Sequence, residues 1–221
     1  MCGMPDAPRR RRWQSRLGWL LIVCGLSLIA YVGWQLYGTN IVSARKHREI
    51  TTSLEQQWEA GKDLATVDSM KADALLRVPR FGKDYAVPIL QGTADDVLAA
   101  GVGHFTETAS VGEVGNYALA GHRVTHGEPF RNLPDLEVGD EIVIETRSTI
   151  YTYVLDTAGD ALVVPFTGTW VLEPLPRNPD GGVQPRQREG QRLITLTTCS
   201  EIFHTDNRMI AFGHLESTER K

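Results

Sequence analysis

The chain has 221 residues, of which 42% are hydrophobic, and this suits one folded domain with additional segments. Its formal net charge is −4, but five of the 23 basic residues and one of the 27 acidic residues precede residue 17, so the remainder carries −8. An acidic body is a poor electrostatic match for nucleic acid, and we exclude a nucleic-acid-binding function on this ground.

The N-terminal region predicts a basic cytoplasmic tail (residues 1–16) followed by a transmembrane anchor (residues 17–37). The apolar stretch contains no charged residue, and a helix of this length rises about 32 Å, close to the hydrocarbon thickness of a bilayer. Tryptophans and a tyrosine lie near its two ends, where amphipathic rings favour the interface. Because the arginines precede the span, the positive-inside rule places everything after Tyr37 outside the cytoplasm.

A cleaved signal peptide is the alternative for this region, since Val42-Ser43-Ala44 would pass as a cleavage site. The apolar stretch is longer than the about 7–15 residues of a usual signal peptide, which favours retention. A lipoprotein signal ending at Cys24 is a weaker match, because the bulky Val23 precedes the cysteine. We therefore expect a single-pass protein of the cell membrane with its N-terminus in the cytoplasm.

The three cysteines differ in where this topology places them. Cys2 lies in the cytoplasmic tail and Cys24 in the span, so Cys199 is left alone outside with no partner for an intramolecular disulfide. An unpaired cysteine in an exported protein is a candidate reactive thiol. The alternative is a small buried hydrophobic residue, which free cysteine usually is.

Residues 38–75 are polar with scattered leucines, and they predict a helical or loosely ordered stalk between membrane and domain. From about Leu76 the sequence changes to short apolar or alternating runs between Gly, Pro and Asp, which predicts a closed antiparallel barrel or a sandwich. A short helix is expected over Ala94–Ala100 with Thr93 as N-cap. The candidate strands are Leu76–Val78, Tyr85–Leu90, Tyr117–Ala120, Glu141–Thr146, Ile150–Leu155, Leu162–Val164, Leu193–Thr198 and Met209–Leu215.

Three pieces of sequence carry side chains that can do chemistry, each at the end of a predicted strand. They are His122, the strand Thr195–Cys199, and Arg208 just before the last apolar run. A thiolate is a strong nucleophile, and a nearby imidazole can exchange protons with it and later with a leaving amine. A guanidinium stays protonated and can donate to the negative charge that acyl transfer builds on a carbonyl oxygen. We therefore predict Cys199 as nucleophile, His122 as acid/base and Arg208 as transition-state stabiliser.

A zinc site made of His122, His126 and Cys199 is the metal-binding alternative. Gly127 and Pro129 argue against a helix that would align the two histidines, and no second cysteine is exported. We therefore predict no metal.

His104, His204 and His214 are expected in loops or on strand surfaces. The alternative for His204 is that it lines the site, because it lies between Cys199 and Arg208 in the sequence. Arg123 follows His122 directly and would point to the opposite face of a continuing strand, so it is predicted to be structural.

These motifs resemble those of the sortases, cysteine transpeptidases of the Gram-positive cell surface. The family pattern is a Gly-His at a strand end, a T-L-x-T-C strand and an arginine on the next strand, and all three occur here in that order. The resemblance covers about residues 76–216. Segments that also look like the family, and most like class E of actinobacteria, are Gly82–Tyr85, Gly115–Ala118 and Thr195–Cys199.

The resemblance implies an all-β fold, a closed eight-stranded sortase-type barrel with short helices over residues 76–219, after the transmembrane helix and stalk. It implies cleavage of a C-terminal sorting signal (Leu-Ala-x-Thr-Gly or Leu-Pro-x-Thr-Gly) between Thr and Gly, without a cofactor. The acyl-enzyme is then resolved by a peptidoglycan-precursor amine. Tyr85 and Thr198 are the implied substrate-binding residues, and Tyr85 is associated in class E with a preference for Ala at the second signal position.

Two alternatives stay open within this resemblance. A pilus-polymerising sortase would use a lysine of another pilin as acceptor, and such enzymes often carry a lid with Asp-Pro ahead of the barrel. Residues 38–75 contain no proline, which counts against it. A catalytically silent barrel that only binds peptides would have no need of a reactive thiol beside a histidine and an arginine.

Overall fold

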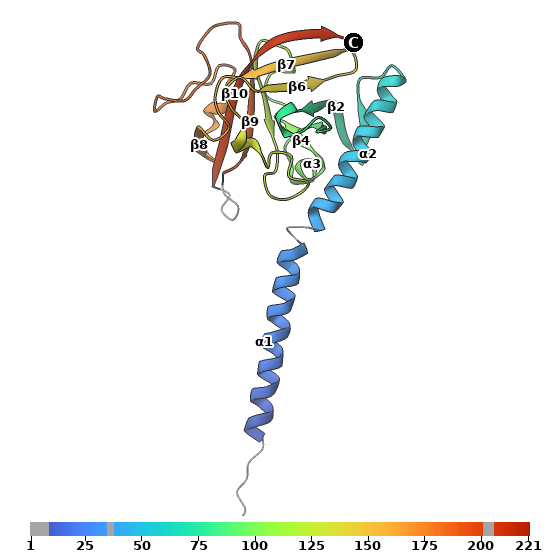
Figure 1. The fold of residues 1–221 in the computed structure, drawn as a ribbon, viewed down its shortest axis with the longest axis vertical. Helices are drawn as coiled ribbons and strands as arrows, with labels where there is room; N and C mark the ends of the chain where they lie inside the picture. Colours follow the sequence, from blue (N-terminus) through green and yellow to red (C-terminus); the bar gives the residue numbers. More distant parts are fainter. Residues whose placement is uncertain (1–8, 35–37, 201–205) are drawn as a thin grey trace, which may run out of the picture.

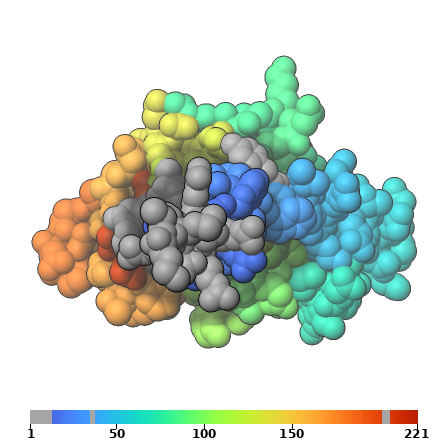
Figure 2. All heavy atoms as spheres, turned by 90° about the horizontal axis from the view of Figure 1, so that it is seen from below, coloured from blue at the N-terminus to red at the C-terminus, as the bar shows by residue number. Residues whose placement is uncertain are grey.

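The computed structural model describes residues 9–34, 38–200 and 206–221. Helix α1 (Arg9–Gly33) projects away from a β-domain, and helix α2 (Thr39–Glu59) lies along one side of that domain (Figure 1). Viewed from the α1 end, α2 flanks one side of the domain and the orange segments around residue 175 flank the opposite side (Figure 2).

Eight strands close a barrel in the described part of the chain. Their order round the barrel is β2 (Met70–Arg77), β3 (Val87–Gln91), β4 (Val102–His104), β5 (Gly115–Ala120), β9 (Arg192–Cys199), β10 (Asn207–Arg220), β7 (Thr149–Leu155) and β6 (Glu141–Glu145). Pairing between β2 and β6 closes the ring. The predicted eight-stranded barrel is therefore confirmed, although β3–β4 and β5–β9 pair in parallel and the sequence had predicted antiparallel pairing.

Two further strands extend the ring. β1 (Ala65–Val67) forms a hairpin with β2, and β8 (Leu162–Pro165) pairs with the first half of β10. Strand β10 is long enough to pair with β8 near its start and with β7 further on. The start of β10, where Arg208 lies, thus has β9 on one side and β8 on the other.

The helical segments inside the domain are short: η2 (Pro79–Phe81), α3 (Asp95–Ala100), η3 (Leu133–Asp135) and η4 (Thr169–Leu172). The expected helix is α3, but the N-cap prediction is wrong. The N-cap position is Ala94, without a side-chain hydrogen bond. Asp95 and Asp96 occupy the first turn, where carboxylates complement the positive end of the helix dipole.

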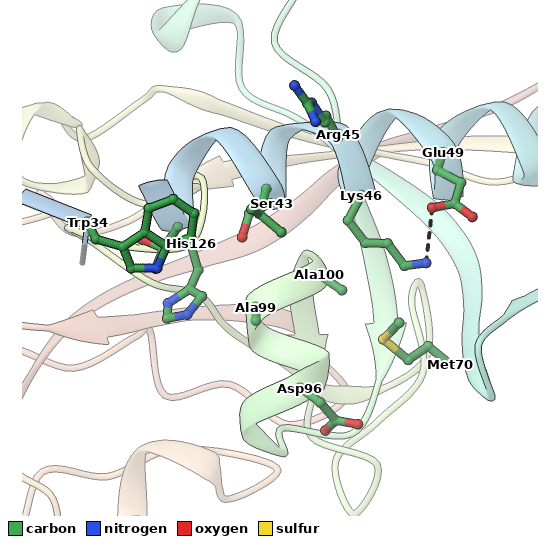
Figure 3. A pocket seen from close by; sticks show the side chains of 12 residues that line it. Trp34, Ser43, Arg45, Lys46, Glu49, Met70, Asp96, Ala99, Ala100 and His126 are labelled. Atoms are coloured by element: carbon green, nitrogen blue, oxygen red, sulfur yellow. Dashed lines mark hydrogen bonds and ion pairs between the residues drawn. The ribbon is translucent and has the colours of Figure 1, made fainter. Parts of the chain in front are cut away.

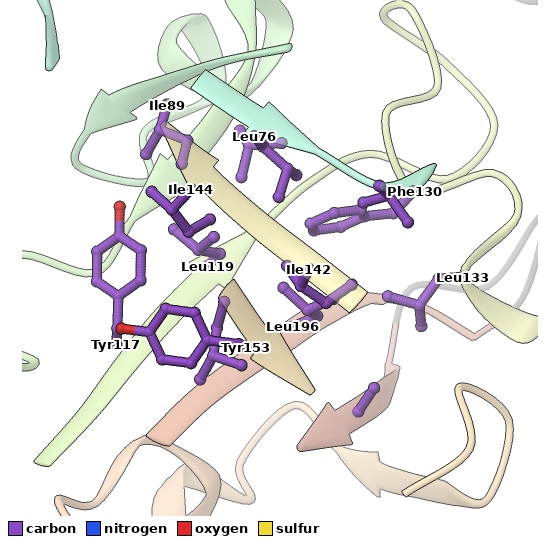
Figure 4. Close-up of a cluster of buried hydrophobic side chains, with 14 of the residues drawn as sticks. Leu76, Ile89, Tyr117, Leu119, Phe130, Leu133, Ile142, Ile144, Tyr153 and Leu196 are labelled. Carbon is purple, nitrogen blue, oxygen red and sulfur yellow. The ribbon is translucent and has the colours of Figure 1, made fainter. Parts of the chain in front are cut away.

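The barrel interior is filled by aliphatic and aromatic side chains from the inward faces of the strands (Figure 4). Tyr153 and Phe130 are the largest fully buried side chains. The Tyr153 hydroxyl accepts a hydrogen bond from Gly112 N at 2.8 Å, which satisfies its oxygen in the interior. A separate cluster covers the outer face of β10, where Ile210 and Phe212 pack with η4.

Helix α2, in the segment predicted as a stalk, packs against the β-domain. The buried residues of α2 are Ser43, His47, Ile50 and Leu54, whose spacing places them on one face of the helix. Ile50 and Leu54 pack with residues of β1, β2, β3 and α3. Strand β2 also begins at Met70, before the predicted start.

Helix α1 contains the one stretch in the described residues that is long and apolar enough to cross a membrane, Trp13–Gly33. Its mean hydropathy is 1.8, and none of it is buried against the domain. The predicted span of residues 17–37 overlaps this stretch, and residues 35–37 lie outside the described part, as does Cys2.

Candidate active site

The ends of β5 and β9 bring the predicted histidine and cysteine to one edge of the barrel. These neighbouring parallel strands pair Ala120 with Thr197, and Gly121 N continues the ladder by donating to Thr197 O at 3.1 Å. His122 and Cys199 each follow this pair by two residues. Because paired strands lie about 4.8 Å apart, both residues leave the sheet side by side.

Cys199 and Arg208 are directly opposite each other on the antiparallel strands β9 and β10. Residues that are directly opposite share one face of a sheet, so the two side chains are neighbours there. Both are partly exposed. The Arg208 guanidinium lies 5.0 Å from the centre of the Phe166 ring, and its Nη1 donates to Asn207 O at 3.1 Å. The ring and this hydrogen bond contribute to holding the guanidinium beside the thiol.

The thiol lies on the outer wall of the barrel. The neighbouring pair on the same face is Thr197 opposite Ile210, and Ile210 belongs to the cluster packed with η4. Met209, on the alternate face, belongs to the interior cluster. Side chains alternate along a strand, so Cys199 and Arg208 point outward, toward the side of the barrel that carries η4.

Thr198 lies on the inward face and is 2% exposed. Its hydroxyl donates to Gly121 O at 2.8 Å, next to His122. The alternation of side chains along β9 explains this burial, since an outward Cys199 requires its neighbour to point inward. The bond to Gly121 O ties the end of β9 to the segment that follows β5. That Thr198 binds substrate stays a prediction.

His122 begins a tight loop that ends at Phe130, where Phe130 N donates to His122 O at 3.0 Å. A Cβ on Gly121 would lie 2.7 Å from the Phe130 ring, so only glycine fits before the histidine. The His122 ring centre lies 4.6 Å from that of His126. Burial, with a smaller contribution from His126, lowers the pKa of His122 to about 4. The imidazole is therefore neutral at pH 7.

Two side chains tie this loop to its surroundings. The Tyr85 hydroxyl donates to Pro129 O at 2.5 Å, while its ring packs edge-on against Phe81 at a centroid distance of 5.2 Å. The Arg123 guanidinium donates to Ser200 O, directly after Cys199. Arg123 had been predicted only as structural, and no sequence motif indicated that it links the histidine loop to the cysteine strand.

Two other histidines, His104 and His214, have structural partners. His104 Nε2 lies 3.1 Å from Ala109 O, and His214 Nδ1 lies 3.1 Å from Asp156 Oδ2. His204 lies outside the described residues. Within the described ranges no group of three or more His, Cys, Asp or Glu side chains is arranged to hold a metal ion.

A cavity of about 650 Å³ lies beside this edge, between α2 and α3. His126 and Trp34 lie near one end of it, and Lys46 and Glu49, which form an ion pair, lie near the other (Figure 3). The cavity thus connects the histidine loop with the helix that follows α1.

Comparison with known proteins identifies the architecture and its motifs. Residues 76–216 match the sortase domain family, which is more than half of the chain. The chain belongs to the sortase family. It is 35% identical over 210 residues to sortase SrtE1 of Streptomyces coelicolor, covering 90% of this chain and 56% of that protein. This sortase therefore spans little more than half the length of that relative.

Solved sortases confirm the fold and the class. Sortase E from Streptomyces avermitilis matches with a TM-score of 0.59 and 40% identity, covering 67% of this chain and 90% of that one. Sortase E1 from Streptomyces coelicolor, solved with a tripeptide in its active site, matches with a TM-score of 0.56 and 36% identity, covering 66% and 89%. These relatives confirm the resemblance to class E.

Proposed function

We propose that this protein is a membrane-anchored cysteine transpeptidase that cleaves a C-terminal sorting signal and transfers the surface protein to an amine. One observation carries the proposal. Strand register places Cys199 opposite Arg208 and beside the end of the strand that leads into His122. The three side-chain types that acyl transfer needs thus lie at one edge of the barrel.

The first half of the reaction follows from the protonation state of the site. Neutral His122 takes the proton of the Cys199 thiol as the sulfur attacks the threonine carbonyl of the signal. Arg208 donates to the resulting oxyanion. The intermediate then collapses by breaking the Thr–Gly bond. The imidazolium gives its proton to the departing glycine amine, which leaves a thioester on Cys199.

The second half reverses these roles. An acceptor amine attacks the thioester carbonyl and passes its proton to His122, and Cys199 leaves as a thiolate that recovers the proton. A peptidoglycan-precursor amine is the proposed acceptor, since the proposed topology places the site on the outer side of the membrane. The five arginines before residue 17 support that orientation, with residues 17–37 as the anchor and residues 1–16 in the cytoplasm.

The proposed donor is a Leu-Ala-x-Thr-Gly or Leu-Pro-x-Thr-Gly peptide. The tripeptide in the active site of the Streptomyces coelicolor relative shows that a class E site takes a short peptide, which supports this substrate class. Tyr85 is proposed to read the second position. Its hydroxyl donates to Pro129 O, and the oxygen still offers lone pairs to an incoming N–H.

The test uses the full-length chain in detergent micelles with a quenched-fluorescence Leu-Ala-x-Thr-Gly peptide. We expect cleavage between Thr and Gly, a thioacyl adduct on Cys199 by mass spectrometry, and an amide product when a glycine-based amine is added. Binding of the peptide without any adduct or cleavage would contradict the proposal and indicate a silent peptide-binding barrel. Product formed only with a pilin lysine peptide would indicate the pilus-polymerising alternative.

A further inference from the structure

The loop that carries His122 contains an unusual run of backbone conformations. His126, Gly127 and Glu128 have φ values of 56°, 80° and 51°, so three consecutive residues lie in the left-handed region. Glycine adopts this region readily, but for His126 and Glu128 it is unfavourable. Such a backbone persists only where surrounding contacts hold it. The contacts on this loop therefore decide its shape.

One side chain from α2 makes two of these contacts. Asn40 Oδ1 accepts a hydrogen bond from Gly127 N at 2.9 Å, and Asn40 Nδ2 donates to Glu128 Oε1 at 2.7 Å. We refer to Asn40, Gly127 and Glu128 as the Asn40 clamp. His47, seven residues after Asn40 in α2, also packs closely against the clamp. A Cβ on Gly127 would lie 2.7 Å from His47 Cε1. The contacts from Asn40 and His47 thus come from a helix that lies 80 or more residues before the histidine loop in the sequence.

The Asn40 clamp is coupled to the proposed acid/base through a short path. The His126 ring, next to the clamp, lies against the His122 ring in a tilted arrangement with ring centres 4.6 Å apart. Phe130 N donates to His122 O and closes the loop. Because the loop is short and closed, a change in the backbone of residues 126–128 is expected to shift His122. Helix α3 lies on the same side, and the Asp95 carboxylate there acts on His122 electrostatically.

We propose that Asn40 is a positioning residue for His122: helix α2, which follows the membrane anchor, fixes the left-handed loop 126–128 and through it the imidazole. This inference rests on the proposed function. On this proposal, the segment predicted as a stalk helps to form the active site. The clamp residue is the second residue of α2, only seven residues beyond the end of α1.

The first test compares Asn40→Ala with Lys46→Ala in the full-length protein. Lys46 also joins α2 to the domain, through Asp68 at 2.6 Å in the β1–β2 turn, and both its ion-pair partners, Asp68 and Glu49, lie outside the histidine loop. Misplacement of a catalytic group by about 1 Å can cost 10²-fold in rate. We expect Asn40→Ala to lower kcat by about 10- to 100-fold with little change in KM, and Lys46→Ala to keep the wild-type kcat.

A double-mutant cycle tests the clamp at the level of its atoms. Asn40→Asp keeps an acceptor for Gly127 N but sets a carboxylate against Glu128. Adding Glu128→Gln supplies an amide donor for that carboxylate, which restores the pair with reversed polarity. We expect Asn40→Asp to lose kcat as Asn40→Ala does, and the double variant to regain it to within about threefold. A double variant no better than Asn40→Asp would overturn the clamp.

A third measurement separates positioning from general stability. A loosened loop admits water to His122, which weakens the effect of burial and raises its pKa from about 4 toward 6.5. The acid limb of the kcat/KM profile should therefore move to higher pH in Asn40→Ala and stay in place in Lys46→Ala. An unmoved limb with wild-type kcat in Asn40→Ala would overturn the proposal. If Cys199→Ala kept its activity, the proposed function itself would be wrong, and this result is distinct from either outcome at Asn40.

Discussion

Two parts of the active site are held in place by different kinds of structure. Cys199 and Arg208 lie on paired strands, where backbone register sets their distance and their common face. His122 lies at the start of a loop whose shape depends on side chains from α2, on Tyr85 and on Arg123. The comparison teaches that the proposed nucleophile is placed by local sheet geometry, whereas the proposed base is placed by contacts from distant segments. Substitutions should separate the two.

The largest expected effect is at the strand-held nucleophile. Cys199→Ala exchanges one small side chain for another, so the fold should persist while the thioester can no longer form. We expect a loss of at least about 10³-fold in peptide cleavage. His122→Ala should fall nearly as far.

Circular dichroism and the melting temperature provide the folding control for both variants. Substantial turnover by purified Cys199→Ala would show that another group is the nucleophile. If His126→Ala proved more damaging than His122→Ala, the assignment of the base would be wrong.

Substitution of Arg208, the second residue held by strand register, is expected to have the next largest effect. Removing one donor to an oxyanion typically costs about 10²–10³ in rate, which we expect for Arg208→Ala. Lysine keeps the charge but has no planar fork, so Arg208→Lys should retain a little activity. The measurement is kcat/KM for the sorting-signal peptide. Near-normal kinetics in both folded variants would reduce Arg208 to a surface charge beside Phe166.

His47 of α2 leads to a prediction about how the stability of the protein depends on pH. Burial lowers the pKa of His47 to about 4, against an ordinary value near 6.5. Between these pH values His47 binds a proton in the unfolded chain but not in the folded chain. Its contribution to the free energy of unfolding is therefore fully present above pH 6.5 and is lost as the pH falls toward 4. The loss from His47 is of order 3 kcal/mol.

Chemical denaturation at several pH values between 4 and 7 measures this loss. His47→Gln cannot take up the proton, so its stability should decline less steeply over the same range. Carboxylates and His122 titrate in both proteins, and the difference between the two slopes isolates His47. Parallel slopes would show that His47 is accessible to protons in the folded state.

The contrast between local strand geometry and distant contacts also explains which features the sequence could predict. All eight candidate strands correspond to strands of the structure, because alternating or apolar runs between turn residues are local signals. β1 and β4 were missed since three residues are too few to show a period. The sequence did not indicate that α2 packs against the barrel, because its buried face combines Ser43 and His47 with only two aliphatic residues.

Within the site, the sequence placed Cys199 and Arg208 at strand ends, and strand register puts them opposite each other. Their catalytic roles stay predictions. The motif did not indicate that Thr198 points inward, because this orientation follows from strand alternation. Asn40 carried no signal at all. Its two bonds join residues 87 and 88 positions apart, and one sequence contains no measure of such proximity.

The smallest expected effect is at Tyr85, whose hydroxyl donates to Pro129 O in the histidine loop. Alanine at the second signal position has a backbone N–H and proline has none. If the Tyr85 oxygen accepts that N–H, proline leaves it unpaired at a cost of about 1–3 kcal/mol. Wild type should then prefer the Leu-Ala-x-Thr-Gly peptide over Leu-Pro-x-Thr-Gly, and Tyr85→Phe should lose much of this preference while still cleaving.

Tyr85→Phe also removes the bond to Pro129 O, and this loss acts on the histidine loop whichever peptide is bound. The two roles therefore separate in one measurement of kcat/KM for both peptides. A loosened loop lowers both values by a common factor and leaves their ratio unchanged, whereas a lost contact with the substrate lowers the Ala value alone. An unchanged ratio in Tyr85→Phe would assign Tyr85 to the loop that holds His122 and leave the choice between Ala and Pro to other residues.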